Sequence, residues 1–345
     1  MQNLQNRLDE IAQKALHKNL NSLDFDFLAL ELFRLHAQHN GVYREWINFL
    51  KIDVNKVHSL QDIPFFPVRF FKTFKVGINA CIQNSTLCFT SSSTTGAKPS
   101  KHFVPNPGIY QSSFLQTFEM FYDSPEQWTI LALLPGYLER TGSSLVFMAE
   151  KLIRSSAHSF SGFYLNDFDK LTQVLQLNRE EGRKTLLLGV SFGLLDFIES
   201  SSFRHARLMN DPGLTIMETG GMKGRRVELT RMELHRHLSD AFQVATVHSE
   251  YGMTELLSQA YSQGHGIFSC PPWMKFLLRE TDNPLAPLTL SDRVGGVNII
   301  DLANVYSCPF LSIDDLGRIK ANHTFEVLGR FDQAEIRGCN LMVNE

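Results

Sequence analysis

Three polar segments of the 345-residue chain combine residue types that could bind a nucleotide. The first is Phe89–Lys101, FTSSSTTGAKPSK, in which a run of Ser, Thr and Gly precedes two lysines. Backbone N–H groups and hydroxyls of such a loop can donate to phosphate oxygens, while Lys98 or Lys101 adds positive charge. The segment lacks the GxxxxGK(S/T) pattern of a Walker loop, and a solvated surface loop would have the same composition. It therefore predicts either a phosphate-binding loop or an ordinary exposed loop.

The second segment is Tyr251–Glu255, YGMTE, together with the upstream stretch Glu218–Gly224, ETGGMKG. YGMTE follows an apolar run that ends near Val247, and it offers an aromatic ring for stacking and a hydroxyl for a phosphate. The carboxylate of Glu255 is a hard oxygen ligand of the kind that Mg²⁺ prefers. The paired glycines of ETGGMKG would let a flat base lie against the backbone. The alternative is a tight turn that carries a hydrogen-bonded tyrosine.

The third segment joins Leu311–Ile319, LSIDDLGRI, to Gly329–Leu341, GRFDQAEIRGCNL. A carboxylate at the end of a strand can accept both hydroxyls of a ribose, and an arginine fifteen positions later can reach the same sugar or its phosphate. A β-hairpin with Asp-Gly turn chemistry and a surface salt bridge would also account for this pattern.

Cys339 in RGCNL is a candidate nucleophile. Its neighbour Arg337 could lower the pKa of the thiol, and a thiolate attacks an activated carbonyl. The alternative is that Cys339 packs as a small hydrophobic residue, as most free cysteines do. We assign the other four cysteines to packing; they are Cys81, Cys88, Cys270 and Cys308.

The elements that must position these segments change along the chain. Apolar residues at helical spacing predict N-terminal helices over Leu4–Leu16, Phe25–His36 and Val42–Leu50, followed by an extended, largely buried segment at Ile63–Phe74, IPFFPVRFFKTF. Short apolar runs then predict strands at Trp128–Leu134, Lys184–Val190, Leu214–Glu218 and Val244–Ser249, with helices between them such as Ser143–Arg154 and Arg231–Phe242. After Ser291 the predicted strands are Gly296–Leu302, Val305–Ile313 and Arg318–Val327. This order predicts an α/β fold closed by a β-rich subdomain, with ligands bound beyond the carboxyl ends of the strands.

Composition excludes several classes of protein. The 33 Lys and Arg nearly balance 36 Asp and Glu, and this net charge of -3 argues against an obligate nucleic-acid surface. The N-terminus lacks the apolar region of a signal peptide, and the most apolar stretch, Leu186–Ile198, is too short to span a bilayer. Five scattered cysteines without a CxxC pair fit neither a disulfide framework nor a zinc site. We expect a cytoplasmic protein with reduced thiols.

The order of the polar segments resembles the adenylate-forming superfamily, which includes acyl-CoA synthetases, nonribosomal adenylation domains and firefly luciferase. The shared motifs are STTG near residue 95, GG near 220, YGMTE at 251, DDLGR at 314 and GRxDxxxxxRG at 329. Within this superfamily the chain is most similar to the LuxE-like acyl-protein synthetases of bacterial fatty-acid reductase systems. The narrower resemblance rests on IPFFPVRFFKTF, LPGYLERTGSSLVFM, ETGGMKGR, EYGMTELLSQAY and RGCNL, and it covers nearly the whole chain.

The resemblance implies the large N-terminal domain of an adenylate-forming enzyme: mixed sheets with flanking helices and a β-rich subdomain, with the usual small C-terminal domain missing. We expect a helical segment over 1–75, an α/β adenylation core over 76–290, the β-rich subdomain over 291–330 and a hinge with a short tail over 331–345. The small domain usually supplies a lysine to the forming adenylate. Lys98, Lys101 and Lys223 are unranked candidates to replace that lysine.

Site roles follow from the same resemblance, position by position. The loop around the ATP phosphates would be formed by Ser92, Ser93, Thr94, Thr95 and Gly96, although GAKPS replaces the Gly-x-Pro-Lys that many members have. Adenine would lie against Gly220, Gly221 and the ring of Tyr251, with Gly252 allowing close approach of the backbone. Thr254 would touch the α-phosphate and Glu255 would hold Mg²⁺. Asp315 would bind the ribose with Arg330 beside it, and Asp314 is a rival for that role.

The implied reaction is ATP-dependent activation of a carboxylic acid, with a fatty acid as the expected substrate, to an acyl-adenylate. The acyl group would pass to a thiol, either Cys339 of the chain itself, as in an acyl-protein synthetase, or coenzyme A. A reductase or carrier protein is a possible acceptor. A non-catalytic fold that binds a nucleotide or a protein is the third alternative.

Overall fold

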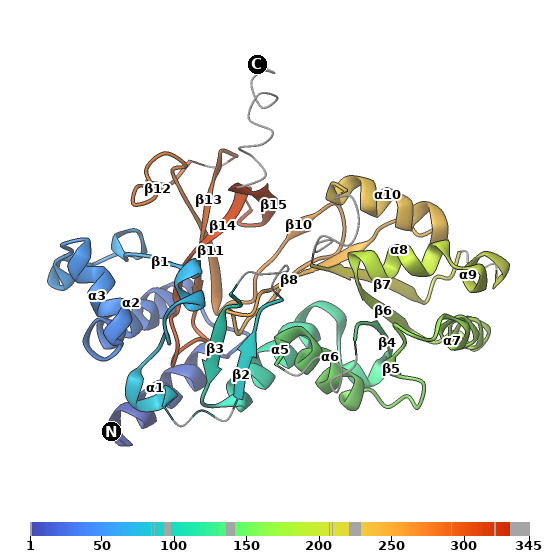
Figure 1. Ribbon diagram of the computed structural model, residues 1–345, viewed down its shortest axis with the longest axis horizontal. Helices are drawn as coiled ribbons and strands as arrows, with labels where there is room; N and C mark the ends of the chain where they lie inside the picture. The colour runs from blue at the N-terminus through green and yellow to red at the C-terminus, as the bar shows by residue number, and fades with distance from the viewer. Residues whose placement is uncertain are drawn as a thin grey trace, which may run out of the picture.

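The computed structural model describes residues 2–83, 85, 87–92, 98–135, 142–206, 208, 210–220, 229–290, 292–320 and 322–331. Three helices open the chain and pack together at one end of the molecule (Figure 1): α1 (Gln2–Ala15), α2 (Ser22–His39) and α3 (Gly41–Phe49). Asn21 and Asn40 cap the N-termini of α2 and α3 by accepting backbone hydrogen bonds. These helices match the predicted ones to within three residues at each end.

Buried polar side chains fix the helices to the rest of the molecule. His36 Nε2 lies 3.0 Å from the carbonyl of Val305, and Asn40 donates to the carbonyl of Ser307 over 2.9 Å. Burial lowers the pKa of His36 to about 4, so its imidazole is neutral at pH 7.

A six-stranded sheet forms the α/β part of the fold. Its strands run in the order β5 (Gly162–Phe163), β4 (Thr129–Leu133), β6 (Thr185–Val190), β7 (Leu214–Thr219), β8 (His248–Tyr251) and β9 (Ala260–Ser262). All pairs are parallel except β8 with β9. Every residue of β4 and β6 is buried, because helices cover both faces.

The helices of this part are α5 (Pro107–Tyr122), α6 (Ser144–Ser155), α7 (Phe168–Glu180), α8 (Ser191–Glu199), α9 (Ser201–Ala206) and α10 (Arg231–Phe242). In Figure 1, α5 and α6 lie on one face of the sheet, whereas α8 and α10 lie on the other. No helix among the described residues combines the length and apolar character needed to cross a membrane.

A seven-stranded sheet forms the β-rich part. Its order is β10 (Ile267–Phe268), β15 (Phe325–Arg330), β14 (Phe310–Ile319), β13 (Val294–Asp301), β11 (Met274–Arg279) and β12 (Pro287–Leu288), and β1 (Phe66–Pro67) pairs in parallel with β14. Three of these strands, β10, β11 and β12, precede residue 291, and β1 belongs to the N-terminal segment. The sheet therefore extends beyond the range 291–330 that was predicted for the subdomain. Pairing between distant segments is not visible in local sequence patterns.

The remaining elements are short. A two-stranded ribbon of β2 (Leu87–Thr90) and β3 (Lys101–Val104) flanks the Ser/Thr-rich loop. One helical turn is α4 (Asn79–Ile82), and the 3-10 turns are η1 (Val54–Lys56), η2 (Leu60–Asp62), η3 (Val68–Lys72) and η4 (Pro125–Gln127).

Four predicted elements differ from the structure. The run Val244–Ser249 is extended only from His248, because Gln243 closes α10 in a left-handed conformation and a turn follows. The run Val305–Ile313 becomes a strand only at Phe310. The predicted strand Arg318–Val327 is interrupted after Ile319 by a turn in which His323 has a φ of 63°. Ile63–Phe74 begins extended, as predicted, but turns into η3 after Pro67.

Candidate active site

Tyr251, Asp315 and Arg330 meet although they come from two different sheets. Tyr251 ends β8, and its hydroxyl donates to Asp315 Oδ2 over 2.8 Å. Asp315 on β14 pairs in register with Arg330 on β15, and Arg330 Nε lies 3.6 Å from Asp315 Oδ1. Burial raises the pKa of the Asp315 carboxyl, while the hydrogen bond from Tyr251 and the charge of Arg330 act in the opposite direction. These contacts join the carboxyl end of the parallel sheet to the β-rich sheet.

The neighbouring carboxylate of Asp314 has a different partner. Both of its oxygens accept from Arg69 Nε at 2.9 Å, at a site where the arginine is largely exposed. Adjacent residues of a strand point to opposite faces, so the two carboxylates diverge. Of the two rivals for the ribose, only Asp315 contacts Tyr251.

Backbone carbonyls of Thr254 and Glu255 are held by two buried side chains. His102 Nδ1 donates to the Thr254 carbonyl over 2.7 Å, and Asn304 Nδ2 donates to the Glu255 carbonyl over 2.8 Å. His102 Nε2 lies 3.2 Å from Asn304 Oδ1, so the two buried side chains are in direct contact. Burial lowers the pKa of His102 to about 4. The backbone of YGMTE is therefore hydrogen-bonded to side chains from β3 and from the loop that precedes β14.

The segment after YGMTE is anchored by a fully buried carboxylate. Asp301 accepts from the backbone N–H of Leu257 at 2.7 Å, from Ser258 Oγ at 2.6 Å and from the N–H of Ala303 at 3.1 Å. Because all these donors come from backbone or hydroxyl groups of the protein, we assign Asp301 a structural role.

The side chain of Glu255 lies in a setting that could hold a divalent cation. It is only 6% exposed, and burial raises the pKa of its carboxyl while a hydrogen bond from Ser100 and the charges of Arg330 and Lys72 lower it. No group of three or more His, Cys, Asp or Glu that could form a metal cage occurs among the described residues. A single carboxylate fits Mg²⁺, which keeps several waters and takes its remaining ligands from substrate phosphates.

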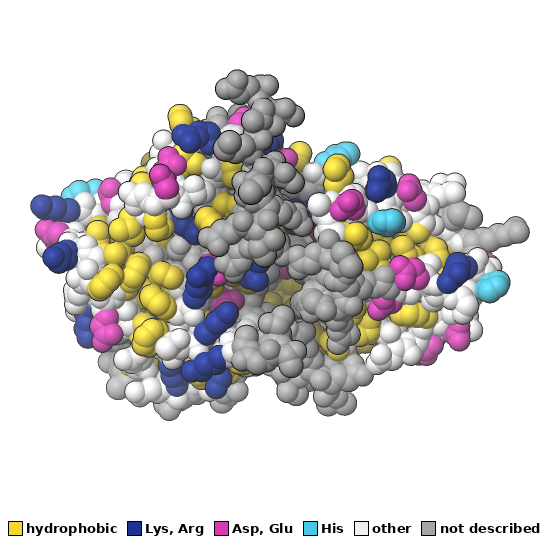
Figure 2. All heavy atoms as spheres, turned by 45° about the horizontal axis from the view of Figure 1, so that its top comes forward, with side chains coloured by type: hydrophobic (Ala, Val, Ile, Leu, Met, Phe, Trp, Pro, Cys, Tyr) yellow, Lys and Arg dark blue, Asp and Glu magenta, His cyan; other side chains and the backbone are white. Residues whose placement is uncertain are grey.

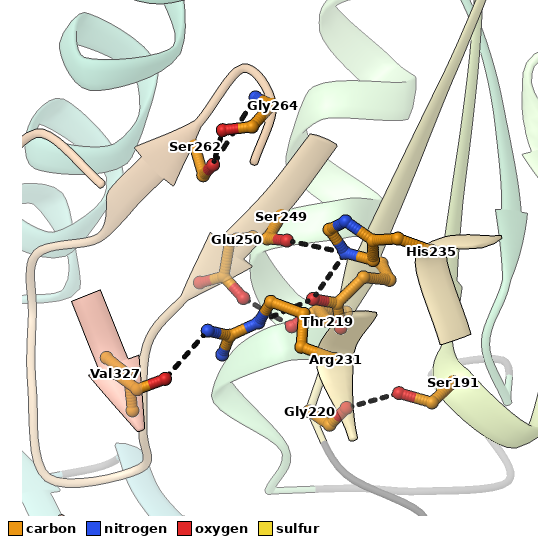
Figure 3. Close-up of polar contacts among 11 residues, drawn as sticks. Ser191, Thr219, Gly220, Arg231, His235, Ser249, Glu250, Ser262, Gly264 and Val327 are labelled. Carbon is orange, nitrogen blue, oxygen red and sulfur yellow. Dashed lines mark hydrogen bonds and ion pairs between the residues drawn. The ribbon is translucent and has the colours of Figure 1, made fainter. Parts of the chain in front are cut away.

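Polar contacts also line the ends of β7 and β8 (Figure 3). Ser191 Oγ donates to the carbonyl of Gly220 over 2.6 Å, and Thr219 Oγ1 donates to Glu250 Oε2. On the other side of these strands, Arg231 Nε and His235 Nε2 each lie 3.5 Å from the same oxygen of the buried Glu218.

Arg231 also links the two sheets. Its Nη1 donates to the carbonyl of Val327 on β15 over 2.9 Å (Figure 3). Its guanidinium lies 5.0 Å from the ring centroid of Phe268. The planar guanidinium can make both contacts at once.

Gly252 lies against the side chain of Glu250. A Cβ at this position would lie 2.5 Å from Glu250 Oε1 and 3.4 Å from the side chain of Gln259. A larger residue would therefore displace the Glu250 carboxylate.

Several predicted residues lie outside the described part of the chain. They are Ser93, Thr94, Thr95, Gly96, Gly221, Lys223 and Cys339. Ser92 is described and exposed, at the start of the predicted phosphate loop. Of the residues predicted to converge, the structure thus brings together Tyr251, Asp315 and Arg330.

Shape alone does not locate the site. A pocket of about 510 Å³ is lined by Leu214, Thr215 and His248 among others, and these residues begin β7 and β8. It therefore lies at the amino ends of these strands, away from Thr219 and Tyr251.

The sequence patterns did not predict the residues outside the motifs whose side chains contact the site. His102 lies directly after the Ser/Thr-rich segment Phe89–Lys101, and Arg69 lies within IPFFPVRFFKTF. Both segments carry motifs described above, but those motifs do not predict the contacts of these two residues. Asn304 and Arg231 carry no local signal, since their contacts depend on how the two sheets pack.

Comparisons with known proteins give one family match and a set of similar folds. Residues 15–103 match the family model described as acyl-protein synthetase, LuxE. No sequence in the curated proteins matches the chain.

Solved structures show the fold. An open conformation of 2-hydroxyisobutyryl-CoA ligase, in complex with 2-HIB-AMP and CoA, aligns with 91% of this chain and 71% of its own at 13% identity and a TM-score of 0.66. ATP-bound MatB from Rhodopseudomonas palustris aligns at 18% identity and a TM-score of 0.51, over 72% of this chain and 48% of its own. The luciferase-like enzyme of the nonluminescent mealworm Zophobas morio aligns at 14% identity and a TM-score of 0.51, over 72% of this chain and 58% of its own. The chain thus spans about half the length of MatB.

Proposed function

We propose that this chain, a LuxE-like member of the adenylate-forming superfamily, activates a carboxylic acid with ATP and passes the acyl group to a thiol. The observation that carries the proposal is the convergence of Tyr251, Asp315 and Arg330, with the Glu255 carboxylate near Arg330. One nucleotide could contact all four residues at the carboxyl end of the parallel sheet, where α/β folds bind ligands.

Nucleotide binding would use the groups that already contact one another. Asp315 accepts hydrogen bonds from the ribose hydroxyls, and Tyr251 and Arg330 hold its carboxylate in place. The base lies near Gly220, whose carbonyl is fixed by Ser191. Stacking of the base on Tyr251 stays a prediction. Tyr251 is only 9% exposed, so little of its ring is open to a base in this conformation.

The adenylation step is a displacement at phosphorus. An oxygen of the substrate carboxylate attacks the α-phosphorus of ATP, and the bond to the bridging oxygen breaks, so that its electron pair leaves with pyrophosphate. The Thr254 hydroxyl donates to an oxygen of the α-phosphate, and Glu255 is the residue that would hold Mg²⁺. When bound, Mg²⁺ would supply positive charge to the phosphate oxygens.

Cys339 is the proposed acceptor of the acyl group. The other four cysteines are poorer candidates, because burial disfavours their thiolate forms. Burial raises the pKa of Cys308 to about 12, and it also raises the pKa of the Cys270, Cys81 and Cys88 thiols. None of these four described cysteines is therefore suited to form a thiolate at neutral pH. Fatty acids are the proposed substrates, and a reductase or carrier protein is the proposed final acceptor, in keeping with the LuxE family match.

An acyl-CoA ligase is the second candidate. It is favoured by the likeness to 2-hydroxyisobutyryl-CoA ligase, whose structure contains CoA. In that case coenzyme A, and not Cys339, would supply the thiol.

Cys339→Ser tests which thiol is used. Adenylation needs only the substrate carboxylate, whereas thioester formation needs a thiolate beside the activated carbonyl. After incubation with ATP, Mg²⁺ and a labelled fatty acid, the unaltered protein should carry hydroxylamine-sensitive label and Cys339→Ser should carry little, while both exchange pyrophosphate into ATP. Cys308→Ser is the matched control and should keep the label. Label that persists on Cys339→Ser, or that appears only on added coenzyme A, would refute transfer to Cys339.

A further inference from the structure

Four aromatic rings form a continuous strip on the surface of the N-terminal segment. The rings of Phe49 and Trp46 stack with 6.0 Å between their centroids, and Trp46 meets Phe70 edge-on at 5.8 Å. Phe70 meets Phe74 in the same way at 5.7 Å. Phe49 is 76% exposed and Phe74 is 44% exposed, so both ends of this aromatic strip lie in solvent. Contiguous exposed apolar surface of this kind marks an interaction site.

The aromatic strip is attached to the hydrophobic core. Phe49 is the last residue of α3, and Phe70 lies within η3. The buried ring of Phe66 on β1 contacts both elements, with centroid distances of 6.4 Å to Trp46 and 5.2 Å to Phe70. The indole N–H of Trp46 donates to the carbonyl of Phe65 over 3.0 Å, so its polar atom is already satisfied within the protein.

Basic residues surround the aromatic strip. The range 44–75 contains six Lys and Arg and three Asp and Glu, whereas the rest of the chain contains 27 and 33. Lys51, Lys56 and Lys72 are exposed, and none of the three forms an ion pair with another described residue. Figure 2 shows hydrophobic side chains gathered over the end of the molecule where α2 and α3 lie in Figure 1, with Lys and Arg side chains along the border of this area. The surface is therefore apolar at its centre and positively charged around it.

The aromatic strip lies close to a strand of the candidate active site. β1, which directly precedes η3, pairs in parallel with β14. Arg69, the residue before Phe70, makes two hydrogen bonds to Asp314, and Asp314 is the neighbour of Asp315 on β14. A surface that binds the aromatic strip would thus lie near the strand that carries the residue proposed to bind ribose.

We propose that the aromatic strip docks on an anionic lipid bilayer, with its rings at the level of the headgroups and the surrounding lysines against the lipid phosphates. Aromatic rings favour the membrane interface, and each lysine near an anionic surface strengthens binding about fivefold. The choice of a lipid surface over an acidic protein rests on the proposed function, because a fatty acid partitions into bilayers and would be taken up from one.

The test is co-sedimentation of the full chain with vesicles of phosphatidylglycerol and phosphatidylcholine in equal parts, and with vesicles of phosphatidylcholine alone. We expect binding to the mixed vesicles, binding about 10-fold weaker or less to the neutral vesicles, and release by added salt. A double variant with Phe49→Ser and Phe74→Ser loses both exposed rings and should bind the mixed vesicles about 10-fold more weakly or less. Met232→Ser is the matched control, since Met232 is 80% exposed on α10, and it should bind like the unaltered protein.

The fluorescence of Trp46 reports on the aromatic strip itself. The other two tryptophans, Trp128 and Trp273, are 8% and 0% exposed. A shift of the emission to shorter wavelength on addition of mixed vesicles should therefore come from Trp46 as it enters the interface. Trp46→Phe should lack this shift.

The outcomes separate this inference from the proposed function, because vesicle binding needs neither ATP nor an acid. Absence of binding to the mixed vesicles would overturn the inference and favour an acidic protein as the partner. Binding that is equal for neutral and mixed vesicles, or unchanged in the double variant, would also overturn it. Vesicle binding by a protein that exchanges no pyrophosphate with any acid would support the inference and overturn the proposed function alone.

Discussion

At the scale of single residues, Asp314 and Asp315 are neighbours with different partners. Asp315 contacts Tyr251 and Arg330, whereas Asp314 pairs with Arg69. Asp315→Ala should therefore weaken ATP binding by about 1.5 to 3 kcal/mol, the scale of a hydrogen bond to a charged group. Asp314→Ala is the matched control and should leave ATP binding nearly unchanged, since it removes a largely exposed ion pair. Titration calorimetry with ATP measures both, and a larger effect of Asp314→Ala would contradict the assignment.

The sequence could predict which motifs carry the chemistry but not which aspartate faces the site. That choice depends on the register of β14 against β15, where Asp315 pairs with Arg330 and a bulge follows at Leu316 and Gly317. A shift of one residue would exchange the faces of the two side chains. The register of β14 against β15 could not be predicted from DDLGR alone. The two strands are joined by a turn, and the sequence pattern did not define the length of that turn.

At the scale of elements, the attachment of the N-terminal helices should depend on pH. His36 is neutral in the folded protein because burial lowers its pKa from 6.5 to about 4. Unfolding exposes the ring, which then takes up a proton below about pH 6.5, so its contribution to stability is complete above that pH and is lost as the pH falls toward 4. His102 adds a second effect of the same sign.

His36→Gln isolates this effect, because a glutamine amide can still donate to the Val305 carbonyl. Denaturant unfolding at about pH 7.5 and about pH 5 should show that the variant loses about 2 kcal/mol less stability on acidification than the unaltered protein. His39→Gln alters an imidazole for which no buried hydrogen bond is described and serves as the control. The same pH dependence in His36→Gln and the unaltered protein would contradict the assignment of a neutral, buried imidazole.

The elements that sequence periodicity predicted best are those with a uniform environment. The fully buried β6 was predicted to within one residue. Both ends of α10 were predicted correctly, and its N-terminus carries a capping box formed by Thr230 and Glu233. The segment Val305–Pro309 was predicted as a strand because it is apolar, but it forms a buried turn. Its backbone carbonyls accept hydrogen bonds from His36 and Asn40 of distant helices, and no local pattern reports such contacts.

At the scale of the whole molecule, the candidate site is built by contacts between the two sheets and the N-terminal segment. The Tyr251–Asp315 hydrogen bond and the Arg231 contact with Val327 connect the parallel sheet to the β-rich sheet. β1 and η3 bring the N-terminal segment to the same place. The adenylate-forming motifs predicted that distant residues would converge. The supporting contacts of His102 and Asn304 depend on how the sheets pack, so no local pattern predicted them.

The central claim, that the chain forms an acyl-adenylate, is tested most directly by exchange of labelled pyrophosphate into ATP over a panel of fatty and aromatic acids. Glu255 is buried and is the residue assigned to Mg²⁺, so Glu255→Gln keeps its shape but removes the charge that a cation needs. We predict acid-dependent exchange by the unaltered protein and a loss of about 100-fold or more in Glu255→Gln, with its thermal unfolding little changed. No exchange with any acid, or exchange at the unaltered rate in Glu255→Gln, would contradict the account.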